Sequence, residues 1–157
     1  VRTVAAMLPV VGAPAVIDPV MIASSGARLL DAGCEQALIE RLLPKVTVLT
    51  PNLPEAEALL GRPLRQGRDL ERAAVDLLAM GPAAVLLKGG HLERGREVVD
   101  LYLDAGGLRE FRAPRLRFRG HGTGCTLASL VAARLALGES PARAAARAIA
   151  AFRKALT

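Results

Sequence analysis

Short apolar runs alternate with longer segments of helical periodicity along most of this chain. The runs at 13–17, 46–49 and 83–87 are apolar and have the length expected of buried strands. Apolar residues recur at helical spacing in the segments 31–43, 53–60, 69–80, 124–137 and 141–156. This alternation predicts a single layered α/β domain over residues 1–157, with a mostly parallel sheet and flanking helices.

The pattern changes after residue 96. Two alternating segments at 97–103 and 108–111 are separated by the turn sequence Asp-Ala-Gly-Gly, which predicts an antiparallel hairpin at one edge of the sheet. The opening segment 1–11 is mostly apolar and has no start signal, so we interpret it as the end of an element that begins upstream. The strand at 13–17 is therefore expected to be an exposed or unpaired edge.

Composition indicates a soluble protein of the cytoplasm. The chain has 157 residues, of which 52% are hydrophobic and 23% charged. No apolar run approaches the ~18 residues that a membrane span needs, so no membrane partner is expected. Cys34 and Cys125 are the two cysteines, too few for a disulfide framework, and free thiols are expected in a reducing compartment.

The formal charge of +6 raises the question of nucleic acid. The basic residues, however, are spread through the predicted helices, and only a series at 112–119 is local. With three Phe, one Tyr and no Trp, the chain has no aromatic platform for stacking bases. We therefore expect no nucleic-acid partner.

Polar side chains follow each of the three predicted parallel strands. Asp18 ends the first strand, Asn52 and Glu55 follow the second, and Lys88 follows the third. The carboxyl ends of parallel strands share the edge at which α/β folds bind ligands. Two carboxylates, Asp18 and Glu55, suit Mg²⁺, and a lysine suits phosphate oxygens.

Structural alternatives exist for each of these residues. Asn52-x-x-Glu55 also fits a capping box at a helix start, which is compatible with a role in binding. Asp18 and Lys88 are equally explained as ordinary polar ends of strands.

The segment 121–126, His-Gly-Thr-Gly-Cys-Thr, predicts a glycine-rich loop that leads into a helix. The first N–H groups of a helix have no partner within it and carry the positive end of its dipole, so Gly122, Thr123, Gly124 and Cys125 form a candidate anion hole. In this position the helix start and Lys88 are expected to favour the thiolate of Cys125. The alternative is a small cysteine that only packs in the loop.

Several other residues and motifs carry less information. His91 and His121 lack partners at metal-binding spacing and are interpreted as loop-packing residues, and Cys34 is interpreted as a small apolar filler. Neither the P-loop motif nor a dinucleotide-binding glycine motif occurs. A nucleotide must therefore be held by other means.

Four motifs occur in a specific order and spacing. They are Asp18-Pro19-Val20-Met21, Thr50-Pro51-Asn52-Leu53-Pro54-Glu55, Leu87-Lys88-Gly89-Gly90-His91 and His121-Gly122-Thr123-Gly124-Cys125-Thr126. Together they closely resemble the bacterial hydroxymethylpyrimidine/phosphomethylpyrimidine kinases of thiamine biosynthesis. The resemblance implies a ribokinase-like fold, ATP with Mg²⁺, and phosphorylation of hydroxymethylpyrimidine and then of its monophosphate.

The resemblance also implies roles for individual residues. Cys125 occupies the catalytic position within the anion hole, and Lys88 resembles the lysine that contacts the ATP phosphates. Asn52 and Glu55 match an Asn-x-x-Glu motif near Mg²⁺ and phosphate. Asp18 resembles the acidic group beside the phosphates, and Val20 a residue that lines the pyrimidine pocket.

Members of this family begin with further strands and helices, so the chain is expected to be the C-terminal part of such a domain. A homodimer is a family expectation. Two alternatives stay open: a pyridoxal or pyridoxine kinase, and a non-catalytic fragment that binds nucleotide or pyrimidine.

Overall fold

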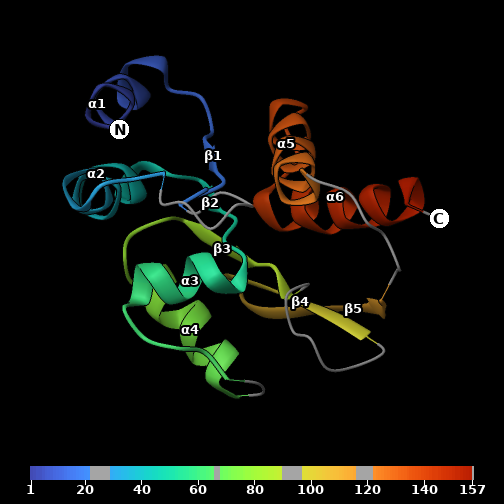
Figure 1. The fold of residues 1–157 in the computed structure, drawn as a ribbon. Helices are drawn as coiled ribbons and strands as arrows, with labels where there is room; N and C mark the ends of the chain where they lie inside the picture. The colour runs from blue at the N-terminus through green and yellow to red at the C-terminus, as the bar shows by residue number, and fades with distance from the viewer. Residues whose placement is uncertain (22–28, 66–67, 90–96, 116–121, 157) are drawn as a thin grey trace.

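A five-stranded sheet forms the centre of the computed structural model, which describes residues 1–21, 29–65, 68–89, 97–115 and 122–156 (Figure 1). Its strands are β1 (Val16–Ile17), β2 (Val48–Leu49), β3 (Ala84–Leu87), β4 (Glu97–Asp104) and β5 (Gly107–Pro114), in that order across the sheet. The pairs β1–β2 and β2–β3 are parallel, whereas β3–β4 and β4–β5 are antiparallel. The predicted α/β fold with an antiparallel edge hairpin is therefore confirmed, and the parallel part of the sheet is formed by β1, β2 and β3.

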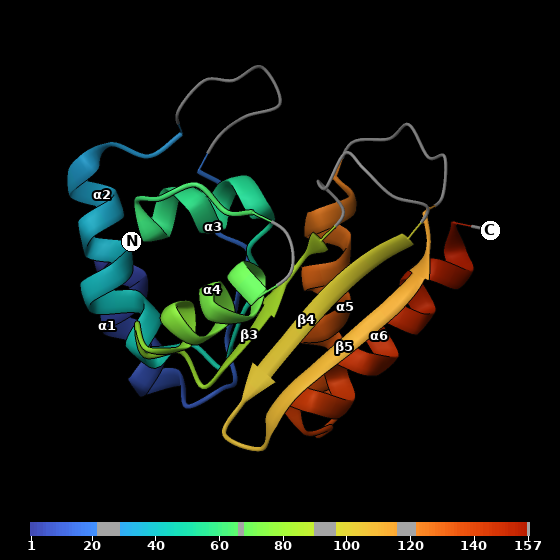
Figure 2. The ribbon, with the colours of Figure 1, turned by 90° about the horizontal axis from the view of Figure 1, so that it is seen from below.

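Helices cover both faces of this sheet. The elements are α1 (Arg2–Val11), α2 (Ala32–Ala37), the π turn η1 (Leu38–Leu42), the 3₁₀ turn η2 (Leu43–Lys45), α3 (Leu53–Leu60), α4 (Arg68–Leu78), α5 (Thr123–Ala136) and α6 (Pro141–Ala155). Helices α1 to α4 lie on one side, and α5 and α6 lie together on the other (Figure 2). The result is a three-layered α/β/α arrangement.

The alternation of side chains along the buried strands builds a separate core on each face. On β3, Val85 and Leu87 pack in the cluster that includes α3 and α4, whereas Ala84 and Leu86 pack in the cluster that includes α5 and α6. All four side chains are fully buried. This two-sided burial explains why β3 is a continuous apolar run without polar alternation.

The predicted helix over 31–43 is irregular in the structure. Asp31 caps α2 by accepting the Cys34 N–H at 2.7 Å, but a π turn and a 3₁₀ turn follow, and the 3₁₀ turn continues through Pro44 to Lys45. Leu38, Leu42 and Leu43 are all buried along this path. These leucines, which recur at near-helical spacing, stay buried through the change of helical pitch.

Helix α4 begins at Arg68, one residue before the predicted segment, so Asp69 lies within its first turn. The Asp69 carboxylate accepts the Arg65 N–H at 2.6 Å and the Arg62 guanidinium at 2.9 Å. The Asp69 carboxylate therefore binds Arg62 and Arg65, which precede the helix. At α6, Ser140 is the N-cap residue by position but makes no side-chain capping bond, and Pro141 is the first helical residue as predicted.

Strand β1 is an edge of the sheet, as predicted for the segment 13–17. Within the described residues it pairs with β2 alone, with Val16 opposite Val48 and Ile17 opposite Leu49. The helix before it, α1, leaves Val10 and Val11 largely exposed. Among the described residues, no helix is both long and apolar enough to cross a membrane.

Candidate active site

Three of the predicted site residues come together at the carboxyl ends of the parallel strands. Asp18 follows β1 directly, while Asn52 and Lys88 form an isolated parallel bridge beyond the ends of β2 and β3. The Lys88 N–H donates to the Pro51 carbonyl at 2.8 Å, which extends the pairing of the two strands. The parallel topology thus delivers these residues to one edge.

Lys88 and Asp18 form a nearly buried ion pair. Lys88 Nζ lies 2.6 Å from Asp18 Oδ1, and the two side chains are 10% and 13% exposed. Lys88 follows Leu86 by two residues, so it points to the same face of the sheet as that side chain, where α5 packs. An ammonium group is therefore held in place under the start of α5.

Asn52 and Glu55 form the predicted capping box at the start of α3. The Glu55 N–H donates to Asn52 Oδ1 at 2.9 Å, and the Asn52 N–H donates to Glu55 Oε2 at 2.8 Å. Glu55 is buried, and burial raises the pKa of its carboxyl, with Lys88 opposing and Asp18 reinforcing that shift. Two carboxylates therefore share the field of a single ammonium group.

The start of α5 is built in a different way. Its N-cap residue is Gly122, at φ 80°, which has no side chain to accept the N–H groups of the first turn. The Thr126 N–H is bonded to the Gly122 carbonyl at 2.9 Å, so the N–H groups without a partner inside the helix are those nearer its start. A Cβ on Gly124 would lie 2.9 Å from Lys88 Nζ. Glycine at this position lets the ammonium approach the first turn closely.

Cys125 lies in this first turn and is exposed. The pKa of its thiol is raised, first by the side-chain interaction with the nearby Asp18 carboxylate, and further by desolvation and the charge of Asp18. Lys88 acts in the opposite direction but does not prevail. Lys88 thus favours the thiolate as expected, but the adjacent carboxylate of Asp18 and desolvation outweigh it, so the net shift favours the protonated thiol.

Of the remaining predicted residues, Val20 lies close to this group in the chain. It is 39% exposed, and its N–H donates to the Asp18 carbonyl at 2.9 Å. His91 and His121 lie outside the described residues. Sequence reasoning missed Asp100, a buried carboxylate on β4 whose signal was its polarity within an apolar run.

The chemistry of the donor set fits Mg²⁺ in part. Asp18 and Glu55 offer hard oxygen ligands, and the two carboxylates face one ammonium group. The described residues contain no group of three or more metal-ligating side chains. Mg²⁺ characteristically binds one or two carboxylates and completes its shell with water and substrate phosphates, so these residues fit it only together with a phosphate ligand.

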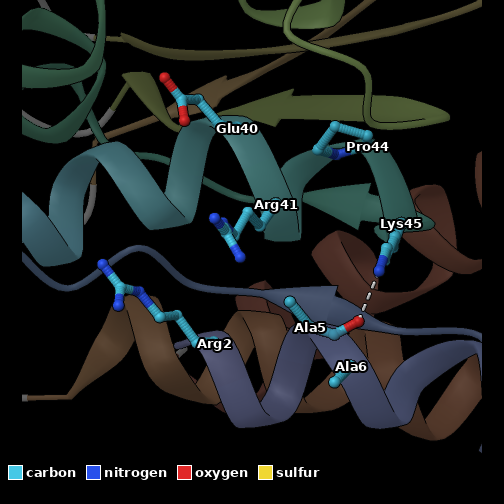
Figure 3. Close-up of a pocket in the computed structure, with 7 residues that line it drawn as sticks. All are labelled: Arg2, Ala5, Ala6, Glu40, Arg41, Pro44 and Lys45. Carbon is cyan, nitrogen blue, oxygen red and sulfur yellow. Dashed lines mark hydrogen bonds between the residues drawn. The ribbon is translucent and has the colours of Figure 1, made fainter.

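A separate cavity of about 310 Å³ lies between α1 and the η1–η2 turns (Figure 3). Arg2, Arg41 and Lys45 contribute cationic groups, and the Lys45 ammonium donates to the Ala5 carbonyl at 2.7 Å. None of the residues that line it belongs to the group around Lys88. The candidate active site is the edge formed by the strand ends and the start of α5.

The layered sheet, with polar residues gathered at the carboxyl ends of its parallel strands, is that of a ribokinase-like domain. The family model described as phosphomethylpyrimidine kinase matches residues 1–157, and the chain belongs to this family. It is 48% identical over 141 residues to a hydroxymethylpyrimidine/phosphomethylpyrimidine kinase of Streptomyces coelicolor, covering 89% of this chain and 52% of that protein. The chain is 45% identical over 134 residues to the thiamine biosynthesis bifunctional protein ThiED of Geobacter sulfurreducens, covering 85% and 27%.

Solved structures agree with the fold. A pyridoxal kinase from Staphylococcus aureus in complex with AMP-PCP and pyridoxal matches with a TM-score of 0.87 and 33% identity, covering 99% of this chain and 56% of that one. A phosphomethylpyrimidine kinase from Clostridium difficile matches with a TM-score of 0.81 and 31% identity, covering 98% and 62%. The chain spans about half the length of the monofunctional relatives it matches.

Proposed function

We propose that this chain carries the phosphate-binding and catalytic edge of an ATP-dependent hydroxymethylpyrimidine/phosphomethylpyrimidine kinase. The observation that carries the proposal is the Lys88–Asp18 pair of 2.6 Å, held against the uncapped start of α5. An ammonium and free helix N–H groups that face the same space suit a phosphoryl group and the charge that develops on it.

Each residue then has a role in phosphoryl transfer. The Lys88 ammonium binds phosphate oxygens of ATP, and the N–H groups at the start of α5, from Thr123 to Cys125, hold the transferring phosphoryl group. Asp18 and Glu55 hold Mg²⁺, with Asn52 fixing the orientation of Glu55 through the capping box. When bound, the metal ion supplies neutralising charge to the phosphates.

Cys125 is the proposed proton acceptor for the substrate hydroxyl group. The hydroxymethyl oxygen gives its proton to the thiolate form of Cys125, which the charge of Lys88 favours and that of Asp18 opposes. The new O–P bond forms as the bond to the leaving ADP oxygen breaks. Val20, exposed beside this group, is the proposed contact to the pyrimidine ring.

A vitamin B6 kinase is the second candidate function. It is favoured by the TM-score of 0.87 to a solved pyridoxal kinase, although relatives at 39–48% identity are named as pyrimidine kinases. A third candidate is binding without turnover. The family resemblance further suggests a homodimer in the cytoplasm.

A coupled ADP-release assay on the intact natural protein tests these candidates. Hydroxymethylpyrimidine, its monophosphate and pyridoxal are compared as acceptors, with and without Mg²⁺. We expect turnover of both pyrimidines to exceed that of pyridoxal and to require the metal. Faster turnover of pyridoxal would favour the B6 kinase, and nucleotide binding without ADP release would favour the binding fragment.

A further inference from the structure

A second carboxylate lies on the opposite side of Lys88 from the α3 loop. Asp100, on β4, is 7% exposed, and its Oδ1 accepts the Gly89 N–H at 3.0 Å. Continuation of the β3–β4 register, in which Leu87 faces Leu101, sets Asp100 opposite Lys88. The hydrogen bond therefore falls on the residue directly after the lysine.

The backbone around Gly89 leaves little room for movement. A Cβ on Gly89 would lie 1.9 Å from the Val99 carbonyl oxygen, so this turn is pressed against β4. On the other side the Lys88 N–H is bonded to the Pro51 carbonyl at 2.8 Å. The two-residue segment Lys88–Gly89 is thus clamped between the α3 loop and β4.

The charge of Asp100 is balanced by the C-terminal helix. Arg153 Nη2, on α6, lies 3.4 Å from Asp100 Oδ2, and the Arg153 side chain is 24% exposed. Burial raises the pKa of the Asp100 carboxyl, while Arg153 and Lys88 oppose that rise. The backbone donor and the cationic partner together offset the cost of burying the Asp100 carboxylate.

We propose that Asp100 is a positioning residue that fixes the Lys88–Gly89 turn, and with it the Lys88 ammonium, for the phosphoryl group. Asp100 is hydrogen-bonded to the backbone of this turn, and its charge also acts on the Lys88 ammonium. Arg153 keeps the carboxylate charged and oriented, which links α6 to the active edge. The kinetic consequence rests on the proposed kinase function, whereas the positioning itself does not.

The positioning is tested first without any assay of activity. In the full chain, the Gly89 amide resonance should follow the titration of Asp100 in an NMR pH series. Arg153→Gln should move the midpoint of that titration to higher pH, because a neighbouring cation is lost. Asp100→Asn should abolish the titration, and Asp104→Asn, which alters a carboxylate on the same strand, should leave it intact. A Gly89 amide that titrates identically in wild type and Asp100→Asn would overturn the proposal.

A double-mutant cycle tests the kinetic consequence. We expect Asp100→Asn to lower kcat/KM for ATP about tenfold to 100-fold, the size of effect expected from misplacing a catalytic group. In a Lys88→Met background the same change should alter the rate by no more than about twofold, since its effect passes through Lys88. Effects that multiply would show that Asp100 acts independently of Lys88 and would overturn the proposal. If the wild-type protein transfers no phosphoryl group, the proposed function fails, and the NMR series still decides the positioning.

Discussion

Two helices begin at the same edge of the sheet but treat their first N–H groups in opposite ways. At α3, the Asn52 side chain accepts the Glu55 N–H at 2.9 Å and the Glu55 side chain accepts the Asn52 N–H at 2.8 Å. Side chains of the helix itself therefore bind these two N–H groups. At α5, Gly122 supplies no side chain, and the Lys88 ammonium lies against the first turn instead. A helix start with its own side-chain caps contributes to stability. A helix start without such caps, beside a cation, can bind an anion through its backbone N–H groups.

The carboxylates Glu55 and Asp18 have different roles at the two helix starts. Glu55 caps the closed start and is buried within it, while Asp18 forms the ion pair with Lys88 beside the open start and raises the pKa of Cys125. Substitutions at the open start should therefore affect catalysis most. Substitutions at the closed start should affect folding most.

Lys88→Met is expected to have a large effect on catalysis. Loss of the ammonium beside the open helix start should lower kcat of the intact protein by about 10²- to 10³-fold, as for removal of one preorganised charge-stabilising donor. Steady-state kinetics with ATP and hydroxymethylpyrimidine measure this. Lys45→Met, at the separate cavity, is the matched control and should keep its kcat.

The pKa of the Cys125 thiol should shift in opposite directions in two charge variants. Because Asp18 raises and Lys88 lowers the pKa of the thiol, Asp18→Asn should lower that pKa and Lys88→Met should raise it. The rate of alkylation by iodoacetamide, measured between about pH 7 and 11, reports the thiolate. The background carries Cys34→Ala so that a single thiol reacts.

In steady-state kinetics of the intact protein, Cys125→Ala should lower kcat by no more than about 10²- to 10⁴-fold and leave ATP binding unchanged. A thiol pKa that moves in the same direction in both charge variants would contradict the geometry of the open start. Retention of wild-type kcat in Cys125→Ala would show that Cys125 only packs in the loop.

Gly122→Ala separates the strain at a helix end from the function of the open start. Gly122 at φ 80° and Gly61 at φ 64°, the C-cap of α3, both have left-handed conformations, and at each of them a Cβ would have no heavy atom within 4 Å beyond its own chain neighbours. Each alanine variant should lower the free energy of unfolding by about 1–2 kcal/mol in urea titrations. Only Gly122→Ala should also slow phosphoryl transfer. Equal rates of phosphoryl transfer in the two variants would contradict a role of the open helix start in catalysis.

The smallest expected effect is at the closed start. Asn52→Ala removes half of the capping box and should lower the free energy of unfolding by about 1 kcal/mol. Asp31→Ala, which removes the side-chain cap of α2, should destabilise the protein similarly. An additional loss of ATP affinity is expected for Asn52→Ala alone, since Asn52 orients Glu55. Identical ATP affinities in the two variants would confine Asn52 to a structural role.

Local sequence patterns predict the order of strands and helices, the hairpin, and the motifs that follow the strands. These features are local, because apolar periodicity, caps such as Asn52 and stops such as Gly61 act within a few residues. The parallel topology then follows from right-handed crossovers, so Asp18, Asn52 and Lys88 were correctly expected to lie together.

Only the tertiary structure decided the electrostatics of the site and the path of the less regular segments. The direction of the Cys125 pKa shift depends on a carboxylate far earlier in the chain, at Asp18. The partnership of Asp100 with Gly89 and Arg153 likewise joins three segments of the chain. The π turn at η1 follows from which leucines are buried. Such properties depend on distances between segments remote in sequence, and no local pattern of residues specifies those distances.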